Sequence, residues 1–291
     1  MRLCFDATRF GTGLQEAVSL AAEKNISACE FAFDGFDLSA KGAKSLSKAE
    51  KEFLHDLDEE AKKKGVEIKC LRLRSVLQVS NEDSRRDFKG QIEKLAKVAE
   101  ALSCKQVIFY LLAEPQENWI AQVEKTLKPI IAGLQKNEIR LLLSLSTPQI
   151  MQGKSLSKWR PIEPQEWRDL LAGIPDLALS YSVADSAWQG IDYLKMLPAL
   201  VPAIEHVEAQ DVQVNRQIIS ENGYFGPLFW RYLTVGKGQV DWAQFVEALK
   251  LYDYKGDISI HFNDEFASEN EQGLMEALEA SIKVLAPLLK Y

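Results

Sequence analysis

The stretch Glu205–Asp211 alternates polar and apolar side chains, and its polar residues are of types that can move protons. In an extended strand, successive side chains point to opposite faces. Val207 and Ala209 then share one face, which we expect to pack against helices. The other face carries His206, Glu208 and Gln210. A buried strand face with three polar groups costs free energy unless those groups are paired, so the pattern predicts a strand that ends at a functional site.

A second candidate residue, His261, lies in the strand-like stretch Asp257–Asn263. If this strand lies beside the strand Glu205–Asp211, Glu208 opposite His261 would form a charge-assisted pair. Such a pair could act as a general acid–base dyad or serve as a purely structural contact, and the sequence leaves both readings open.

Strand-like and helix-like segments alternate eight times along the chain. The strand-like segments are Arg2–Thr8, Ile26–Phe33, Val66–Arg74, Gln106–Ala113, Glu138–Ser146, Asp176–Ala184, Ile204–Asp211 and Asp257–Asn263. The helix-like segments are Leu14–Lys24, Ser47–Lys64, Ser84–Leu102, Glu117–Gln135, Pro164–Leu171, Trp188–Leu197, Asp241–Leu251 and Glu271–Leu289. Ser47 followed by Glu50 predicts an N-terminal cap, and Gly65 predicts the stop of the same helix. We expect Val212–Gln239 to be a long irregular excursion.

Strict alternation of strands and helices implies a parallel sheet with helical crossovers. Eight such units predict an α/β fold, a (β/α)₈ TIM barrel with eight parallel strands and outer helices, as one domain over residues 1–291. Active sites of these barrels lie at the C-terminal ends of the strands. That rule selects Glu30, Arg74, Ser146, Ser182, Asp185, Glu208, Gln210, Asp211, His261 and Asn263.

Composition limits the function classes. The net charge of −7 argues against a nucleic-acid or anionic-membrane surface. No apolar run reaches the ~18 residues of a membrane helix, and we expect no secretory signal. The four cysteines lie scattered beside apolar runs, as in a reduced cytoplasmic protein. Gly11-Thr12-Gly13 lacks the third glycine of a dinucleotide fingerprint, so no nucleotide cofactor is expected.

Three stretches carry a resemblance to a known family. They are Trp188–Leu194, His206–Asp211 and Val235–Trp242, the last with the spacing Gly-x-Gly-x-x-Asp-Trp. On these residues the chain resembles the xylose-isomerase-like barrels of the sugar-phosphate isomerase/epimerase superfamily. The resemblance is specific over roughly the last 110 residues. It implies a TIM barrel whose active members isomerise or epimerise sugars.

The resemblance also implies a divalent metal, such as Mn²⁺ or Mg²⁺, held by Glu, Asp, His and Glu. By strand position these ligands fall on Ser144, Ser182, Glu208 and His261, so all four differ from the family. Two serines cannot replace two carboxylates around a hard dication. We therefore expect no metal and no other cofactor. A site rebuilt from Asp185, Glu208 and His261 stays an alternative.

Other residues could bind a ligand at the mouth of the barrel. We select Glu30, Arg74, Asp185, His206, Gln210 and Arg216 for this role. A guanidinium from Arg72 or Arg74 beside Glu30 could take the electrostatic place of the metal, and the alternative is that both arginines reach solvent. Trp159 and Trp230 could stack on a ligand, although packing is the simpler role of Trp230.

Three functions follow from these residues. The first is a barrel that has lost the metal site and binds a small polar or anionic ligand without catalysis or with an altered function. The second is a working isomerase or epimerase for a sugar, polyol or small keto acid, in which Glu208 and His261 transfer protons and Arg74 or Arg216 holds an anionic group. The third is subunit assembly through the excursion, whose aromatic residues are Tyr224, Phe225, Phe229 and Trp230. Whether the chain forms a homo-oligomer is left open.

Overall fold

The computed structural model describes residues 1–10, 13–32, 46–115, 117–146, 161, 163–224 and 226–290. One eight-stranded sheet has the order β1-β10-β7-β6-β5-β4-β3-β2. Its strands are β1 (Arg2–Phe5), β2 (Ala28–Ala32), β3 (Glu67–Gln78), β4 (Gln106–Leu112), β5 (Arg140–Ser144), β6 (Ala178–Ser182), β7 (Ile204–Ala209) and β10 (Asp257–Ile260). The strands follow one another in chain order and pair in parallel. This is the strand order of a (β/α)₈ barrel, and the predicted fold class is confirmed.

The chain divides into two compact units. Unit 1 comprises Met1–Phe10, Leu145–Ser155 and Ser180–Tyr291, and unit 2 comprises Gly11–Ser144 and Leu156–Leu179. The organisation as one domain stays a prediction.

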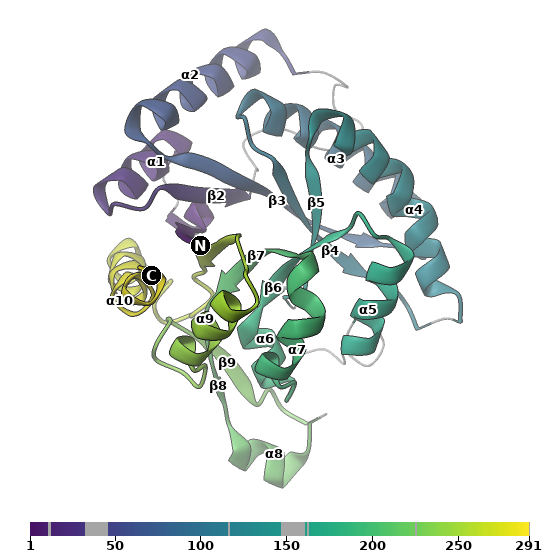
Figure 1. The fold of residues 1–291 in the computed structure, drawn as a ribbon, viewed down its shortest axis with the longest axis vertical. Coiled ribbons are helices and arrows are strands. Elements are labelled where there is room, and N and C mark those ends of the chain that lie inside the picture. The colour runs from purple at the N-terminus through teal and green to yellow at the C-terminus, as the bar shows by residue number, and fades with distance from the viewer. Residues whose placement is uncertain are drawn as a thin grey trace. The chain divides into compact units, whose positions relative to one another are not determined.

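Unit 2 holds the first half of the alternating pattern. Its helices are α1 (Leu14–Glu23), α2 (Lys48–Lys64), α3 (Glu82–Ala101), α4 (Trp119–Leu134), the 3₁₀ turn η2 (Gln135–Asn137) and α5 (Pro164–Gly173). In Figure 1, α3 and α4 run alongside β3, β4 and β5. The interior face carries Cys70, Ile108, Leu142 and Ala178, one from each of four successive strands. Leu142 and Ala178 thus lie on the inner face, as two-residue alternation along their strands predicts.

Local signals set the ends of α2 as predicted. The Ser47 hydroxyl accepts from the backbone N–H of Glu50 at 3.2 Å, and the Glu50 carboxylate accepts from the N–H of Ser47 at 2.5 Å. Gly65 ends the helix with φ of 68°. Only glycine adopts this left-handed conformation at no cost.

Unit 1 holds the second half of the pattern and one addition to it. Its elements outside the sheet are the 3₁₀ turns η1 (Ala7–Phe10) and η5 (Val201–Ala203), the helices α6 (Val183–Trp188), α7 (Tyr193–Leu200), α8 (Arg216–Asn222), α9 (Trp242–Leu251) and α10 (Glu271–Leu289), and the strands β8 (Asp211–Val214) and β9 (Trp230–Leu233). Tyr181 of β6 stacks on Phe245 of α9 with ring centroids 6.3 Å apart. The large residues of β6 therefore face the helices, as predicted.

Several predicted bounds are wrong: for example, the last strand ends at Ile260 rather than Asn263, and the third continues to Gln78 rather than Arg74. Strand β6 ends at Ser182 rather than Ala184, because the Ser182 hydroxyl accepts from the N–H of Asp185 and starts α6. The next helix consequently begins at Tyr193, capped by Asp192, rather than at Trp188. Strand β1 ends at Phe5, and residues Ala7–Phe10 form a 3₁₀ turn.

The stretch predicted as an irregular excursion contains two short strands and a helix. Strands β8 and β9 pair antiparallel, with Asp211 opposite Leu233 and Val214 opposite Trp230. Helix α8 lies between them along the chain. We call residues 211–233 the β8–β9 arm. A hydrogen bond from Asn215 N–H to the Phe229 carbonyl, 2.6 Å long, lies just beyond the pair of Val214 and Trp230, where the ladder meets α8. A two-residue periodicity was present at Asp211–Val214, but its partner strand is too short to stand out from the sequence.

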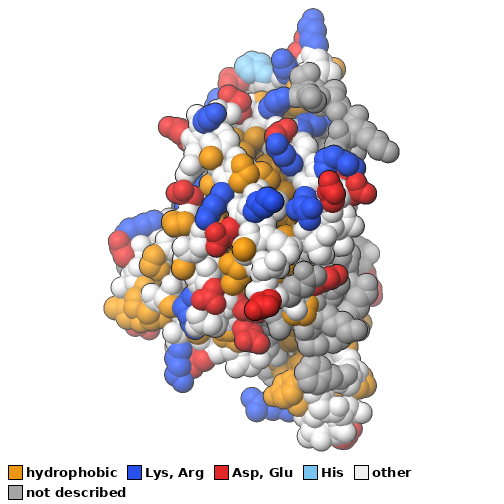
Figure 2. All heavy atoms as spheres, turned by 90° about the vertical axis from the view of Figure 1, so that its right-hand side faces the viewer, with side chains coloured by type: hydrophobic (Ala, Val, Ile, Leu, Met, Phe, Trp, Pro, Cys, Tyr) orange, Lys and Arg blue, Asp and Glu red, His pale blue; other side chains and the backbone are white. Residues whose placement is uncertain are grey.

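The face over α3, α4 and α5 carries both signs of charge. Figure 2 shows Lys and Arg side chains interspersed with Asp and Glu. Such mixing creates no extended positive potential of the kind that attracts a nucleic-acid backbone. Among the described residues, no helix is both long enough and apolar enough to span a bilayer.

Candidate functional site

A serine on β6 joins the two polar residues of β7. The Ser180 hydroxyl donates to Glu208 Oε1 at 2.7 Å and lies 2.8 Å from His206 Nδ1. All three side chains are at most 1% exposed. Two-residue alternation predicts His206 and Glu208 on one strand face, and their shared contact with Ser180 confirms that arrangement.

The protons of this triad follow from donor counting. A carboxylate only accepts, and a hydroxyl has one proton. Since Ser180 gives its proton to Glu208, the bond to His206 must use the Nδ1–H of the imidazole. A neutral His206 is thereby held in the Nδ1–H tautomer, and its Nε2 carries the lone pair.

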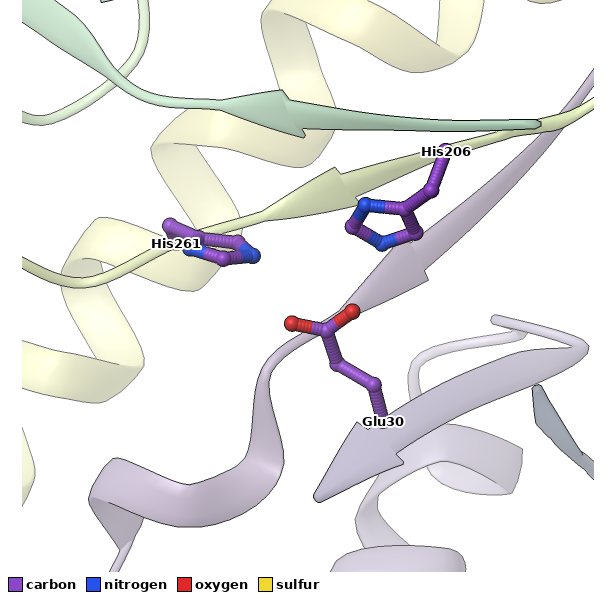
Figure 3. Close-up of side chains that lie close together, drawn as sticks. All are labelled: Glu30, His206 and His261. Atoms are coloured by element: carbon purple, nitrogen blue, oxygen red, sulfur yellow. The ribbon is translucent and has the colours of Figure 1, made fainter. Parts of the chain in front are cut away.

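His261 lies beside the other oxygen of Glu208. Its Nδ1 is 3.6 Å from Glu208 Oε2, and both side chains are buried. Its backbone N–H donates to the carbonyl of Ala209, which fixes this residue next to β7. Figure 3 shows His206 on β7 and His261 just after β10, with ring centroids 6.2 Å apart. Unit 1 thus gathers one carboxylate and two imidazoles, a set that can accept, hold and return a proton.

Asp185 is engaged in structural contacts. Its Oδ2 accepts from the Ser182 hydroxyl at 2.6 Å, and its Oδ1 accepts from Trp188 Nε1 at 3.2 Å. The Tyr232 hydroxyl donates to it from β9, 2.9 Å from Oδ1. Three donors on one buried carboxylate tie the end of β6, helix α6 and the β8–β9 arm together.

Gln210 and Asn263 form the next cross-strand contact after Glu208 and His261. Asn263 Nδ2 donates to Gln210 Oε1 at 2.5 Å. Asn263 Oδ1 in turn accepts from Arg9 Nη2 at 3.2 Å. Gln210 is 1% exposed, whereas Arg9 is at the surface. The predicted ligand residue Gln210 is therefore at the inner end of a chain of three side chains.

Asp211 explains the Gly-x-Gly-x-x-Asp-Trp stretch. Its Oδ1 accepts from the N–H groups of Val212 and Val240, and its Oδ2 accepts from Gly236 N–H and Trp242 Nε1, all at 2.9–3.1 Å. Gly236 has φ of 83°, and a Cβ on Gly238 would clash with Asp211. The glycines let the backbone wrap the carboxylate, so the motif has a structural role.

Unit 2 has a polar cluster of its own around Glu30, which is labelled in Figure 3 on β2. Glu30 Oε1 accepts from Arg72 Nη2 at 3.0 Å, and Cys70 Sγ donates to its Oε2 at 3.3 Å. Arg72 also donates to the Tyr110 hydroxyl at 3.0 Å. Glu30 is fully buried and Arg72 is 5% exposed. A guanidinium does pair with Glu30, and it belongs to Arg72.

The other predicted residues lie elsewhere. Arg74 is exposed on β3, where the register with β4 shifts between Arg72 and Val76. Arg216 is exposed at the start of α8. Trp230 stacks on Trp188 with centroids 4.6 Å apart and is 8% exposed. Trp159 and Phe225 lie outside the described residues.

Neither Ser180 nor Tyr232 was predicted as a site residue, and the sequence left Arg72 and Arg74 as alternative partners of Glu30. Ser180 alternates with Tyr181 and Leu179 on β6, so its inward direction was predictable. Its two partners were not, because a serine among small inner-face residues carries no signal of what lies opposite. Tyr232 was hidden within the stretch read as irregular.

The resemblance implies a divalent metal, so the residues at its ligand positions must supply charge and donor atoms for a dication. In unit 1 these positions are Ser182, Glu208 and His261. The Ser182 hydroxyl is neutral and donates to Asp185, and Glu208 already accepts from Ser180. A hard dication needs several anionic oxygens or imidazoles, and these three residues of unit 1 supply one carboxylate, one imidazole and one hydroxyl.

Comparisons with known proteins agree with the geometry. A family model described as the xylose isomerase-like TIM barrel matches residues 18–284. The chain belongs to this family. An uncharacterised protein of Bacillus subtilis, YfiH, is 28% identical over 116 residues, which are 36% of this chain and 37% of that relative.

Two solved structures show how varied the chemistry of this fold is. The probable 3-DHS dehydratase AsbF of Bacillus anthracis has a TM-score of 0.70 at 15% identity, covering 98% of this chain and 99% of that one. The 3-keto-D-glucoside 4-epimerase YcjR of E. coli has a TM-score of 0.70 at 12% identity, covering 99% and 98%. At such identities the likeness establishes the fold alone, and function must come from the site.

Proposed function

We propose that this chain binds a small polar or anionic molecule with the residues at the ends of β6, β7 and β10, without the family's resident metal. The observation that carries the proposal is the state of Ser182. It stands where the family has a metal-binding Asp, yet its hydroxyl caps α6 and donates to Asp185. A neutral hydroxyl that is engaged in holding a helix in place supplies no negative charge to a dication.

Metal content tests this proposal directly. We expect purified protein to contain far less than one Mn²⁺, Mg²⁺, Co²⁺ or Zn²⁺ per chain. Addition of these ions at about 1 mM should leave the melting temperature unchanged, because only ions that bind the native state stabilise it. Elemental analysis that gives near one metal per chain, lost in Glu208→Ala or His261→Ala, would overturn the proposal.

A second candidate function is a metal-independent isomerase or epimerase. The buried pair of Glu208 and His261, 3.6 Å apart, favours it. Glu208 would remove a proton from the carbon next to a carbonyl, and His261 would protonate the carbonyl oxygen to give an enediol. Return of a proton to the neighbouring carbon or to the opposite face, with loss of an enediol hydroxyl proton to His261, then gives the isomer or epimer, with no net change in atoms.

Turnover in deuterated water distinguishes the two functions. Ketoses, inososes and hydroxypyruvate incubated with the protein should gain carbon-bound deuterium if proton transfer occurs. Glu208→Gln removes the base at nearly constant shape and should abolish the exchange. Retention of exchange in Glu208→Gln would exclude Glu208 as the base, and binding without exchange in the wild type would favour the first function.

A further inference from the structure

Three side chains of unit 1 form a hydrogen-bonded chain whose direction is fixed. Arg9 has only donors, so Asn263 must turn its Oδ1 toward it. Asn263 then offers Nδ2 to Gln210, which accepts through Oε1. The remaining polar atom of Gln210 is Nε2. The guanidinium at the surface therefore determines that the buried end of the chain presents a donor.

That terminal donor lacks an acceptor among the residues that the structure describes. Gln210 Nε2 is buried and makes no hydrogen bond to them. A buried donor without a partner costs about 1–3 kcal/mol. An acceptor oxygen brought by a ligand would recover this cost, and it would do so out of water, where hydrogen bonds are stronger.

The direction of the chain also selects the charge of the ligand. Each hydrogen bond in an aligned chain polarises the next, and the chain begins at a permanent cation. The hydrogen-bonded chain therefore makes a positive contribution to the potential at its donor end, which favours an anionic acceptor over a neutral one. Because Gln210 is 1% exposed, a ligand must displace the side chains that cover it, and the compensating contact must be correspondingly strong.

Gln210 lies one step beyond the acid–base pair. The contacts Glu208–His261 and Gln210–Asn263 join the same two chain segments and are separated by two residues on each. Side chains two residues apart in extended chain share a face, at a spacing of roughly 7 Å. One small molecule can therefore contact both.

We propose that Gln210 Nε2 binds the carboxylate of a small hydroxy- or keto-carboxylate, with the hydroxyl or carbonyl group of that molecule directed to Glu208 and His261. This inference rests on the proposed ligand-binding function and names the ligand class. It commits to a carboxylate, and neutral sugars of the same size are the competing outcome.

Isothermal titration calorimetry with matched probes tests the ligand class. Hydroxypyruvate and glycerate carry the carboxylate, while dihydroxyacetone and glycerol are their neutral counterparts. We expect each acid to bind at least ten times more tightly than its neutral counterpart. Equal affinities within a pair, or binding of the neutral compounds alone, would overturn the proposal.

Two variants and one control test the hydrogen-bonded chain of Arg9, Asn263 and Gln210. Gln210→Glu replaces the donor by an anion of the same shape and should weaken acid binding at least tenfold. Asn263→Asp still accepts from Arg9 but can no longer donate, so Gln210 should turn its Nε2 toward the carboxylate introduced there, with the same loss. Gln213→Glu adds the same charge at an exposed position whose Oε1 accepts from Arg231 Nε and should leave binding unchanged. Wild-type affinity in Gln210→Glu would refute the role of Nε2.

Nuclear magnetic resonance of the wild type guards against variants that fail to fold. The side-chain NH₂ signals of Gln210, assigned by their absence in Gln210→Leu or by backbone correlation, should shift when hydroxypyruvate is added. No shift at saturating acid would overturn the inference. A metal-free protein that fails this test leaves the proposed function standing, whereas a stoichiometric metal overturns that function whatever Gln210 does.

Discussion

Ser180 donates its hydroxyl proton to Glu208 across the neighbouring strands β6 and β7, 2.7 Å away, and so connects Glu208 with His206. One hydroxyl thereby satisfies two buried polar groups and sets the tautomer of an imidazole. The acid–base residues of the site depend on a residue that performs no proton transfer to a ligand itself.

Replacing this serine should be costly. Ser180→Ala leaves the buried Glu208 and His206 without a shared partner and should lower the free energy of unfolding by about 1–3 kcal/mol. Ser259 is an internal control, since it is equally buried on β10 and its hydroxyl makes no hydrogen bond among the described residues. Ser259→Ala should be neutral or slightly stabilising. Urea unfolding followed by circular dichroism measures both, and equal costs would contradict the role of Ser180.

Gly238 should tolerate no side chain. A Cβ there would clash with the Asp211 carboxylate and with the Val212 carbonyl, both of which are held by hydrogen bonds. We expect Gly238→Ala to lower the melting temperature by several degrees, because a loss of about 1 kcal/mol shifts it by roughly 2–4 °C in a chain of this size. Gly133→Ala on α4 meets no atom within 4 Å and should stabilise the helix by about 0.5–1 kcal/mol. A destabilised Gly133→Ala with an unaffected Gly238→Ala would reverse this assignment.

The thiols should be unreactive in the folded protein. Burial raises the pKa of Cys104 to about 12, and burial with the nearby charge of Glu30 raises the pKa of Cys29 further. The thiolate is the reactive form, so neither should react with Ellman's reagent at pH 8 until denaturant is added. All four cysteines are buried. Rapid release of one equivalent from native protein, lost in Cys104→Ser or Cys29→Ser, would contradict the expectation.

Acid should weaken the cap of α2. Hydrogen bonds from Ser47 lower the pKa of Glu50, with a smaller contribution from Lys94. A carboxyl whose pKa is lower in the folded state contributes stability above its unfolded-state pKa and loses it as pH falls through the lower folded-state value. Ser47→Ala should therefore lower the free energy of unfolding by about 1 kcal/mol at pH 7. The unfolding free energy of this variant should also depend less on pH below about 4.5 than that of the wild type. Glu52→Gln, which removes a charge in the same turn of α2, should retain the wild-type pH dependence. Unfolding curves at pH 7 and pH 3 compare the three proteins.

Features governed by neighbouring residues in the sequence were predictable. The ends of α2 follow from Ser47, Glu50 and Gly65, and α10 has the predicted bounds Glu271–Leu289. The face of β7 that carries His206 and Glu208 follows from two-residue alternation alone. These predictions depend only on backbone geometry, which the sequence encodes locally.

Features governed by contacts between segments far apart in the sequence could not be predicted. The alternating pattern of β6 continues to Ala184, but the Ser182 cap and the Tyr232 contact with Asp185 favour a helix from Val183. Arg72 and Arg74 have the same spacing pattern on β3, and only the register shift after Arg72 separates the buried one from the exposed one. Choosing between such alternatives requires the partner residue, which lies 42 positions away for Arg72 and Glu30.

The arm that carries α8 has a use in protein engineering. Asn215 and Phe229 are joined where α8 meets the strands, and Val214 pairs with Trp230 next to them. The hydrogen bonds around Asp211 hold the other end of the β8–β9 ladder. Two adjacent anchor points, with mostly exposed residues among those described between them, define a replaceable module. A peptide tag or a small domain inserted between Asn222 and Tyr224 would leave both anchors intact.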